Sequence, residues 1–560
     1  MTGMWSVPMQ QLVVAPVLLP LATAALLLLL GERRRVSAAA LSLASTLAGL
    51  VLAVSLLLWV HRQEAPAAFG VYLPGNWPVP FGIVLVLDRL SALMMVLAGS
   101  AGLAALSFSL ARWHRSGVHF HPLFQMQLVG LYGAFLTADL FNLFVFFEVL
   151  LAASYGLLMH GGGGDRVRAG LHYIAINLVA SLLFLIGVAL LYGVTGTLNM
   201  ADIAQKLSQV PDSDRGLLRA GAAILSIAFL AKAAVWPLNF WLPPAYAAAG
   251  APVAALFAIL TKVGVYAVLR LWTLGFQGSA GPSALFGGGV LVWGGLMTLA
   301  FGALGMMASQ RLDRLAGFSV IASSGTLLSA IGFNAPALSA GALFYLASST
   351  LAGCALFLLV ELMERARQVQ LAPLADDDDH LPDFLDAEPP RDTNLDDEEE
   401  ALTGRAIPAA LAFLGLAFVL CALVVAGLPP LSGFVGKVAM LSALLDAPGI
   451  AAGAAAAPTL FVLLIVSGLL AATGLVRVGI RHLWAPQNRP SPRLRVIECV
   501  PIALLLAACV LLVLRGEPAL TYARATADAL HQPQRYIDAV LGARPVLREF
   551  TAGTVERVAP

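Results

Sequence analysis

Four ionisable residues lie inside long apolar segments of this chain: Glu148, Lys232, Lys262 and Lys437. A charge within a bilayer is costly unless it is paired or neutralised, so such residues usually face the interior of a helix bundle and mark ion or proton pathways. Burial lowers the pKa of a lysine from about 10.4 toward the physiological range, and a nearby carboxylate raises it again. The four residues therefore predict a path along which lysines lose and regain protons.

The use of lysine in this chain supports that interpretation. Of 33 basic residues only four are lysines, and the fourth, Lys206, lies outside the apolar segments. Arginine keeps its proton at any physiological pH and cannot serve as a proton carrier. We infer that arginine sets the membrane topology and that lysine is kept where deprotonation matters.

Two of the lysines lie close to prolines that should interrupt a helix. Pro237 follows Lys232, and Pro429 and Pro430 precede Lys437. A proline removes a backbone donor and clashes with the preceding turn. Interrupted membrane helices commonly line ion sites near the middle of the bilayer. The pattern recurs after about 200 residues, as a duplicated half-channel would require.

Other polar residues are weaker candidates. His172, near the start of an expected span, is a candidate proton relay because histidine titrates near neutral pH. Asp88 is expected to form a local pair or a helix cap, and Asp139 to lie at the outer end of a span. His119 and His121 flank an expected membrane edge, where we do not expect a metal site.

The cysteines show no paired metal spacing, and each lies in an apolar stretch, so we expect small buried side chains. No haem, iron–sulfur, zinc or nucleotide motif is evident. We therefore expect no cofactor and no metal, so that energy must come from an ion gradient or from partner subunits. The four cysteines are Cys354, Cys421, Cys499 and Cys509.

The elements that must position these residues are membrane helices. Apolar residues make up 59% of the 560 positions and charged residues 12%, about half the usual charged share. This composition excludes an ordinary soluble enzyme and a disordered chain, and the net charge of +1 offers no basic surface to a nucleic acid. Segments long enough to cross a bilayer predict an all-α membrane protein with about fourteen spans. They lie near 11–31, 36–60, 84–110, 120–137, 139–160, 168–195, 217–242, 251–275, 285–309, 313–334, 337–365, 405–446 (one interrupted span), 457–480 and 496–514.

The distribution of charge predicts the orientation. The arginines at 33–35 follow the first apolar segment, which places the first loop in the cytoplasm and the N-terminus outside. Fourteen spans then return the C-terminus to the outside. Residues 376–400 hold thirteen acidic residues and one basic residue, and predict a solvated cytoplasmic loop. Residues 516–560 predict short amphipathic helices on the outer surface.

Four motifs stand out along the chain: 138–148 (ADLFNLFVFFE), 232–243 (KAAVWPLNFWLP), 260–266 (LTKVGVY) and 427–437 (GLPPLSGFVGK). Together they resemble motifs of the antiporter-like subunits of Mrp-type multisubunit cation/proton antiporters and of respiratory complex I. Within that family the chain looks like the D subunits of the Mrp (Mnh, Pha) antiporters.

The resemblance implies a fourteen-helix fold with inverted five-helix repeats, helices 4–8 and 9–13, in which helices 7 and 12 are broken. It divides the chain into N-terminal helices (1–118), a first half (119–280), a second half (281–485) with the acidic loop at 366–404, and a final helix with an amphipathic tail (486–560). It implies that Glu148 and Lys232 form the ion pair of the first half-channel, that Lys262 is the central relay and that Lys437 ends the second half.

Two departures from the family pattern affect the expected relay. Tyr246 stands where many relatives have histidine, and the segment 337–365 has no histidine. We expect Ser348 or Ser349, with water, to connect Lys262 and Lys437. Tyr266 is a further candidate relay residue.

The leading interpretation is a proton-translocating subunit of a Na⁺ or K⁺/proton antiporter in the bacterial cell membrane, a secondary transporter and not an enzyme. Its expected partners are other antiporter subunits, protons, Na⁺ or K⁺ and the lipid bilayer, with no nucleic acid. The alternative is a proton-pumping subunit of a complex I-like or membrane hydrogenase complex. A third interpretation is a structural membrane scaffold whose lysines form static ion pairs.

Overall fold

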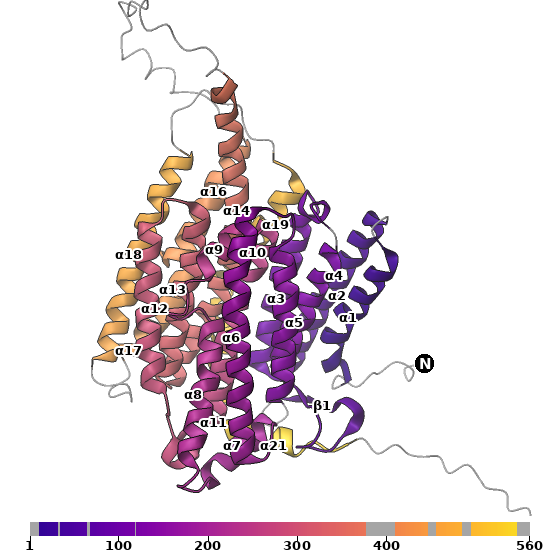
Figure 1. Ribbon diagram of the computed structural model, residues 1–560. Helices are drawn as coiled ribbons and strands as arrows, with labels where there is room; N and C mark the ends of the chain where they lie inside the picture. The colour runs from indigo at the N-terminus through magenta and orange to yellow at the C-terminus, as the bar shows by residue number, and fades with distance from the viewer. Residues whose placement is uncertain are drawn as a thin grey trace, which may run out of the picture.

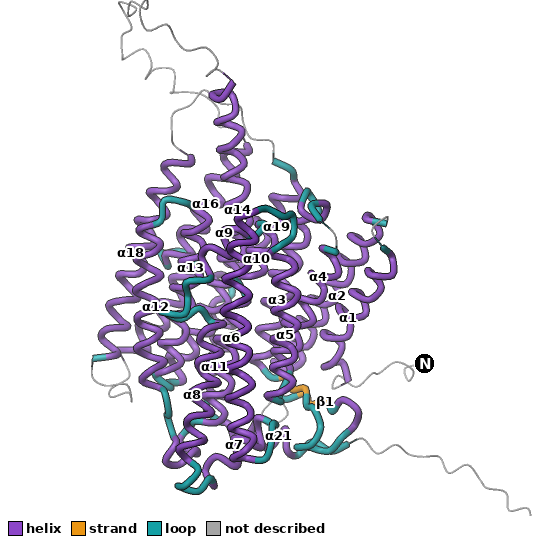
Figure 2. The backbone as a smooth tube through the Cα atoms, in the orientation of Figure 1, coloured by secondary structure: helices purple, strands orange, loops and turns teal. Residues whose placement is uncertain are grey.

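The computed structural model describes residues 11–31, 34–63, 68–117, 119–376, 409–445, 455–483 and 494–545. These residues form one bundle of helices that run side by side (Figure 1), and loop segments gather mainly at its two ends (Figure 2). A single two-stranded antiparallel sheet is present in this part of the chain. It pairs β1 (Gly70–Tyr72) with β2 (Leu85–Leu87), with Gly70 opposite Leu87.

Each of the fourteen expected spans corresponds to a helix or to a pair of helices. Twelve are long and apolar enough to cross a membrane, and the other two are the 17-residue α4 and the interrupted α8–α9 pair. The spans are α1 (Ala15–Leu30, after η1 at Gln11–Val14), α2 (Arg35–Arg62), α3 (Arg89–Ser109), α4 (Phe120–Leu136), α5 (Leu140–Leu158), α6 (Gly164–Thr195), α8 (Arg215–Lys232) with α9 (Leu242–Ala248), α10 (Ala251–Phe257) with α11 (Leu260–Gly275), α12 (Gly288–Ala308), α13 (Leu312–Gly332), α14 (Pro336–Asp376), α16 (Ala409–Ala426) with α17 (Ser432–Leu445), α18 (Ala456–Leu483) and α19 (Val496–Leu514).

Short helices lie between and after the spans. In the tail, two helices follow the last span, and apolar residues on them, among them Ala527 and Val540, are buried against the bundle. The tail beyond residue 545 and nearly all of the acidic segment predicted at 376–400 lie outside the described residues. The short helices are η2 (Pro74–Asn76), η3 (Trp113–Arg115), α7 (Met200–Lys206), η4 (Leu207–Gln209), η5 (Gly278–Ser283), α20 (Gly516–Leu530) and α21 (Pro533–Leu541).

Both predicted helix breaks are confirmed, and the structure adds a milder distortion at a third place. Helix α8 ends at Lys232, and α16 ends two residues before the Leu428-Pro429-Pro430 turn. At 258–259 the helix is distorted between α10 and α11, although both residues keep helical dihedral angles, and Lys262 lies in the first turn of α11. No proline or glycine occupies 258 or 259, so local sequence gives no sign of this distortion.

Glycines allow the interrupted helices to pack closely. A Cβ atom on Gly264 would lie 2.7 Å from the backbone nitrogen of Ala233, just after α8. A Cβ atom on Gly433 would lie 2.0 Å from the carbonyl oxygen of Val424 in α16. Only glycine permits these contacts, which bring α11 against the end of α8 and the start of α17 against α16.

Candidate functional site

Lys232 lies at the end of α8 and faces a small buried cavity. Its Nζ lies 5.2 Å from the centre of the Phe147 ring, a cation–π distance. The cavity, about 30 Å³ in volume, is also lined by Ser154, Tyr173 and Asn177. The hydroxyls of Ser154 and Tyr173 are hydrogen-bonded at 2.6 Å. Lys232 is thus partly buried beside an aromatic wall that contains a few polar groups.

Glu148, on α5, is bonded to a hydroxyl and not to the lysine. Ser181 of α6 donates its hydroxyl hydrogen to the Glu148 carboxylate. The carboxylate is close enough to Lys232 to interact electrostatically, but no direct ion pair joins these two described residues. The ion pair expected from the resemblance is therefore corrected to a longer-range attraction, because Ser181 holds the carboxylate and the lysine lies against Phe147.

Lys262 is held by two serines in series. It is only 1% exposed, and its Nζ donates to Ser323 Oγ on α13 at 2.8 Å. Ser323 in turn donates to Ser349 Oγ on α14 at 3.0 Å. The sequence predicts a role for Ser349 but not for Ser323, which makes the direct contact.

A cavity connects this serine pair with Lys437. It measures about 30 Å³, and Lys262, Ser323, Ser349 and Lys437 all line its wall. Further hydroxyls face the same space, from Ser319, Thr326, Tyr345 and Ser467. A cavity needs roughly 10–15 Å³ and two or more polar partners to hold a water molecule, so this one can hold water between the two lysines.

Lys437 lies in α17 directly beside the break. Its Nζ donates at 2.9 Å to the carbonyl oxygen of Ala426, the last residue of α16, and 8% of the residue is exposed. Carbonyls at the end of a helix lack intrahelical partners and are free to accept such a bond. Gly427, with φ at +74°, turns the chain next to the lysine side chain. The break therefore creates the binding position for Lys437.

Ser348, the other expected relay serine, does not line this cavity. Its hydroxyl is hydrogen-bonded to Ser432 at 2.7 Å, where it joins α14 to the start of α17. Of the two serines that the sequence left open, the geometry favours Ser349 as the connecting group.

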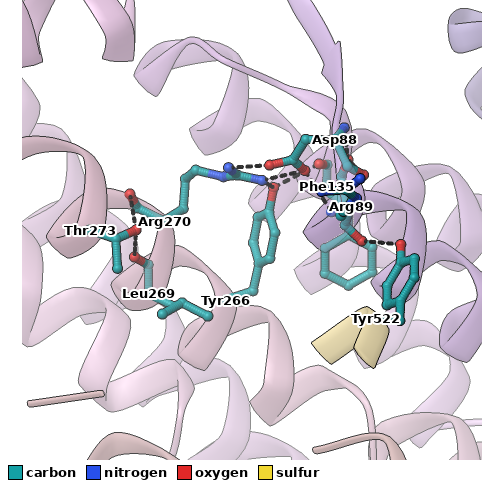
Figure 3. A network of polar contacts seen from close by, with 9 residues as sticks. Asp88, Arg89, Phe135, Tyr266, Leu269, Arg270, Thr273 and Tyr522 are labelled. Atoms are coloured by element: carbon teal, nitrogen blue, oxygen red, sulfur yellow. Dashed lines mark hydrogen bonds and ion pairs between the residues drawn. The ribbon is translucent and has the colours of Figure 1, made fainter. Parts of the chain in front are cut away.

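Tyr266, one turn after Lys262 on α11, belongs to a separate network (Figure 3). Its hydroxyl donates at 2.7 Å to the carbonyl oxygen of Phe135, and Arg270, one turn further along α11, lies 3.4 Å from it. Arg270 binds the Asp88 carboxylate with two hydrogen bonds, at 2.6 and 2.8 Å. The Tyr536 ring of α21 also lies 5.1 Å from the guanidinium. Tyr266 is therefore part of a buried structural network and does not line the cavity between the lysines.

Asp88 acts as the expected helix cap, but its ion-pair partner is distant and not local. It accepts the backbone hydrogen bond of Ser91 at the start of α3. No role for Arg270 is predicted from the sequence, because the arginines are inferred there to set the membrane topology. In the structure Arg270 is only 5% exposed within α11. The rule applied to the lysines, an ionisable residue inside an apolar segment, would have identified it.

His172 and Tyr246 lie away from the lysine cavities. His172 is exposed at the end of the bundle, with Nδ1 2.9 Å from the Arg168 carbonyl oxygen, and it lines a separate open cavity. Tyr246, found where relatives have histidine, is buried and donates to the carbonyl oxygen of Phe257 at 2.7 Å.

Within the described residues no cluster of three metal-ligating side chains occurs, at His119 and His121 or elsewhere.

A charged cluster that was not predicted from the sequence lies at the end of the bundle near η3. Arg365 joins two carboxylates, Glu361 on its own helix at 3.0 Å and Glu498 of α19 at 2.9 Å. Trp113 donates to Glu361 at 2.6 Å. The adjoining turn carries His160, whose Nε2 lies 3.0 Å from the Trp113 carbonyl oxygen, and burial lowers the pKa of this histidine.

Residues 137–389 match the family model described as NADH:quinone oxidoreductase/Mrp antiporter, transmembrane. The chain is 53% identical over 539 residues to the D subunit of a probable K⁺/H⁺ antiporter of Rhizobium meliloti strain 1021, covering 96% of this chain and 98% of the relative. It is 33% identical to the D subunit of a Na⁺/H⁺ antiporter of Alkalihalophilus pseudofirmus, covering 95% of this chain and all of the relative.

The fold is similar to that of a chain in the structure of the Mrp complex from Dietzia sp. DQ12-45-1b. The TM-score is 0.79 at 26% sequence identity, and the match covers 96% of this chain and all of that one. The glutamate, the three lysines and the helix breaks thus occur in a fold similar to that of a chain of the Mrp complex.

Proposed function

The chain belongs to the family of D subunits of Mrp-type Na⁺(K⁺)/H⁺ antiporters, which is related to the antiporter-like subunits of complex I, and we propose that it conducts protons along Glu148, Lys232, Lys262 and Lys437. Its partners are the other subunits of such a complex. It is a multi-span membrane protein and a transporter subunit.

The observation that carries the proposal is the hydroxyl-lined connection between two buried lysines. Lys262 donates to Ser323, Ser323 donates to Ser349, and Ser349 faces the cavity that Lys437 also lines. A hydroxyl can accept one proton while it donates another. With one or two waters in the cavity, a proton from Lys262 can reach Lys437 without crossing an apolar gap.

In the first half of the path, the Glu148 carboxylate regulates Lys232 through space. Ser181 fixes the carboxylate, so that its charge acts on Lys232 without a direct bond. Protonation of Glu148 would weaken this attraction and favour release of the lysine proton. The neighbouring Ser154 and Tyr173 hydroxyls line the cavity that Lys232 faces, and they can pass on the proton that Lys232 releases.

The orientation proposed from the sequence has both termini outside the cytoplasm of a bacterial cell. It rests on arginines in or beside alternate loops, such as Arg112, Arg166, Arg311 and Arg477, which the positive-inside rule assigns to the cytoplasm. The transported cation is Na⁺ or K⁺, in keeping with the names of the two relatives.

The test is cation-driven proton movement in everted membrane vesicles that contain the whole complex. We expect Lys232→Ala and Glu148→Ala each to abolish the movement while the complex still assembles. Lys206→Ala is the matched control, because Lys206 is a partly exposed lysine paired with Asp202 in α7. Unchanged exchange in both path variants would refute the proposal, and loss of assembly in both would favour a structural role. Co-purified flavin or iron–sulfur subunits would favour the redox-linked alternative.

A further inference from the structure

An open cavity of about 530 Å³ lies at one end of the bundle, apart from the lysine path. Its floor is formed by α9 and by the segment after the helix break that follows Lys232. Helix α9 packs between α6 and α13, and these two helices supply the sides (Figure 1). The lining residues are Asp165, Arg168, Ala169, His172, Phe240, Pro244, Ala247, Ala248, Arg311 and Arg314.

The cavity has a strong excess of positive charge. Three arginines and a histidine line it, against the single carboxylate of Asp165. Arg311 is paired with Asp313 on the adjoining turn. The guanidinium groups of Arg168 and Arg314 have no acceptor among the described side chains and carbonyls, and both residues are exposed. Two forked donors therefore face the cavity without a partner, which is the arrangement that binds phosphate.

Apolar surface adjoins this charge on the membrane side. Phe240, which lines the cavity, is 57% exposed, and Trp236 in the same break is 42% exposed. Helix α6, which supplies one side of the cavity, also exposes apolar residues, including Leu171 at 64% and Leu182 at 62%. A ligand that fills this site must combine an anionic head with apolar chains.

We propose that this cavity binds the phosphate headgroup of an anionic phospholipid, whose acyl chains cover the exposed residues of the α8–α9 break. Basic pockets between membrane helices are suited to such headgroups. An acidic protein segment would satisfy the arginines but would leave Trp236 and Phe240 uncovered, so the combination of charge and apolar surface favours the lipid. The inference goes beyond the proposed proton path and does not depend on it.

The binding test uses the purified whole complex in nanodiscs of phosphatidylcholine, titrated with phosphatidylglycerol. Bound lipid is counted by native mass spectrometry, and the rise in melting temperature gives the affinity. The variant Arg168→Gln/Arg314→Gln should bind phosphatidylglycerol about thirtyfold more weakly, because each basic residue near an anionic headgroup contributes about fivefold. Arg481→Gln, an exposed arginine at the end of α18, is the matched control and should leave binding unchanged.

The outcomes separate binding of an anionic lipid from binding of any lipid and from binding of a protein segment. Equal phosphatidylglycerol binding by wild type and double variant would overturn the proposal. The proposal would also be overturned if the double variant lost phosphatidylcholine binding as much as it lost phosphatidylglycerol binding. Crosslinking of a partner subunit's acidic segment to residues 168 and 314 would also overturn it. If the glutamine variant does not assemble, Arg168→Lys/Arg314→Lys keeps the charge and removes the forked donor. This second variant should bind phosphatidylglycerol more weakly than wild type, and unchanged binding would contradict the site.

Discussion

Replacing Ser323 with alanine removes the hydroxyl that joins Lys262 to the rest of the path. The structure gives this hydroxyl two bonds, one from the Lys262 ammonium at 2.8 Å and one to Ser349 at 3.0 Å. A hydrogen bond to a charged group contributes about 1.5–3 kcal/mol. If that contribution is lost from the proton-transfer step, the rate should fall between about 10-fold and 150-fold.

The proton-transfer rate in Ser323→Ala should fall without reaching zero, because water can partly replace the missing hydroxyl oxygen. The adjoining cavity already has room for water, and the deleted hydroxyl enlarges it. Ser323→Thr keeps the hydroxyl, adds one methyl group and should retain most of the flux. The assay is the initial rate at which added Na⁺ or K⁺ dissipates a proton gradient in everted vesicles, normalised to the assembled complex.

Ser329→Ala is the matched control for this prediction. Ser329 lies on the same helix, α13, is fully buried and donates only to the Gly325 carbonyl oxygen of its own helix. Its replacement should leave the flux within about twofold of wild type, because its hydroxyl bonds only within its own helix and touches neither lysine. Equal fluxes in Ser323→Ala and Ser329→Ala would refute the hydroxyl path.

Three further predictions concern the helices around the path. Asp88→Asn leaves Arg270 buried without its charge partner and should cost about 3–5 kcal/mol of stability, seen as a lower melting temperature of the solubilised complex. Gly427→Ala forces a side chain onto a backbone with φ of +74° and places Cβ 2.5 Å from the Lys437 side chain, so transport should fall with assembly intact. His160→Gln should reduce the loss of melting temperature between pH 7.5 and 5.5, because the lowered pKa of His160 means that the unfolded chain binds more protons below about pH 6.5 and destabilises the fold there.

Each of these predictions has a contradicting result. For Asp88, the double variant Asp88→Leu/Arg270→Met removes both charges and should recover part of the stability lost in Asp88→Asn. A double variant less stable than Asp88→Asn would contradict the explanation that the unpaired charge of Arg270 causes the loss. For Gly427, Gly193→Ala is the control, since a Cβ atom there has open space around it, and equal transport in the two variants would contradict the crowding. For His160, an identical pH dependence in variant and wild type would contradict the assignment.

The membrane spans and two helix breaks could be predicted because their causes are local. An apolar segment of about 20 residues must cross the bilayer, and prolines such as Pro237 and Pro430 remove backbone donors wherever they occur in a helix. The distortion at 258–259 could not be predicted in this way. It has no proline or glycine, so it depends on how α10 and α11 pack against the rest of the bundle.

The lysines could also be predicted from the sequence, whereas their partners could not. A lysine in an apolar segment is costly enough to identify from local sequence alone. A serine such as Ser323 costs little free energy in a membrane helix and occurs there often. Its role depends on a contact with a lysine 61 residues away. The Asp88–Arg270 pair joins residues 182 positions apart, and only the folded bundle shows that the two charges meet.

The central claim, that the buried lysines must release their protons, is tested most directly at Lys437. Lys437→Arg keeps the positive charge and the donor to the Ala426 carbonyl oxygen, but arginine does not deprotonate. We predict that the complex with Lys437→Arg assembles and loses cation-driven proton flux in everted vesicles, while Lys206→Arg keeps wild-type flux. Wild-type flux in Lys437→Arg would show that a fixed charge is sufficient and would contradict the proton path.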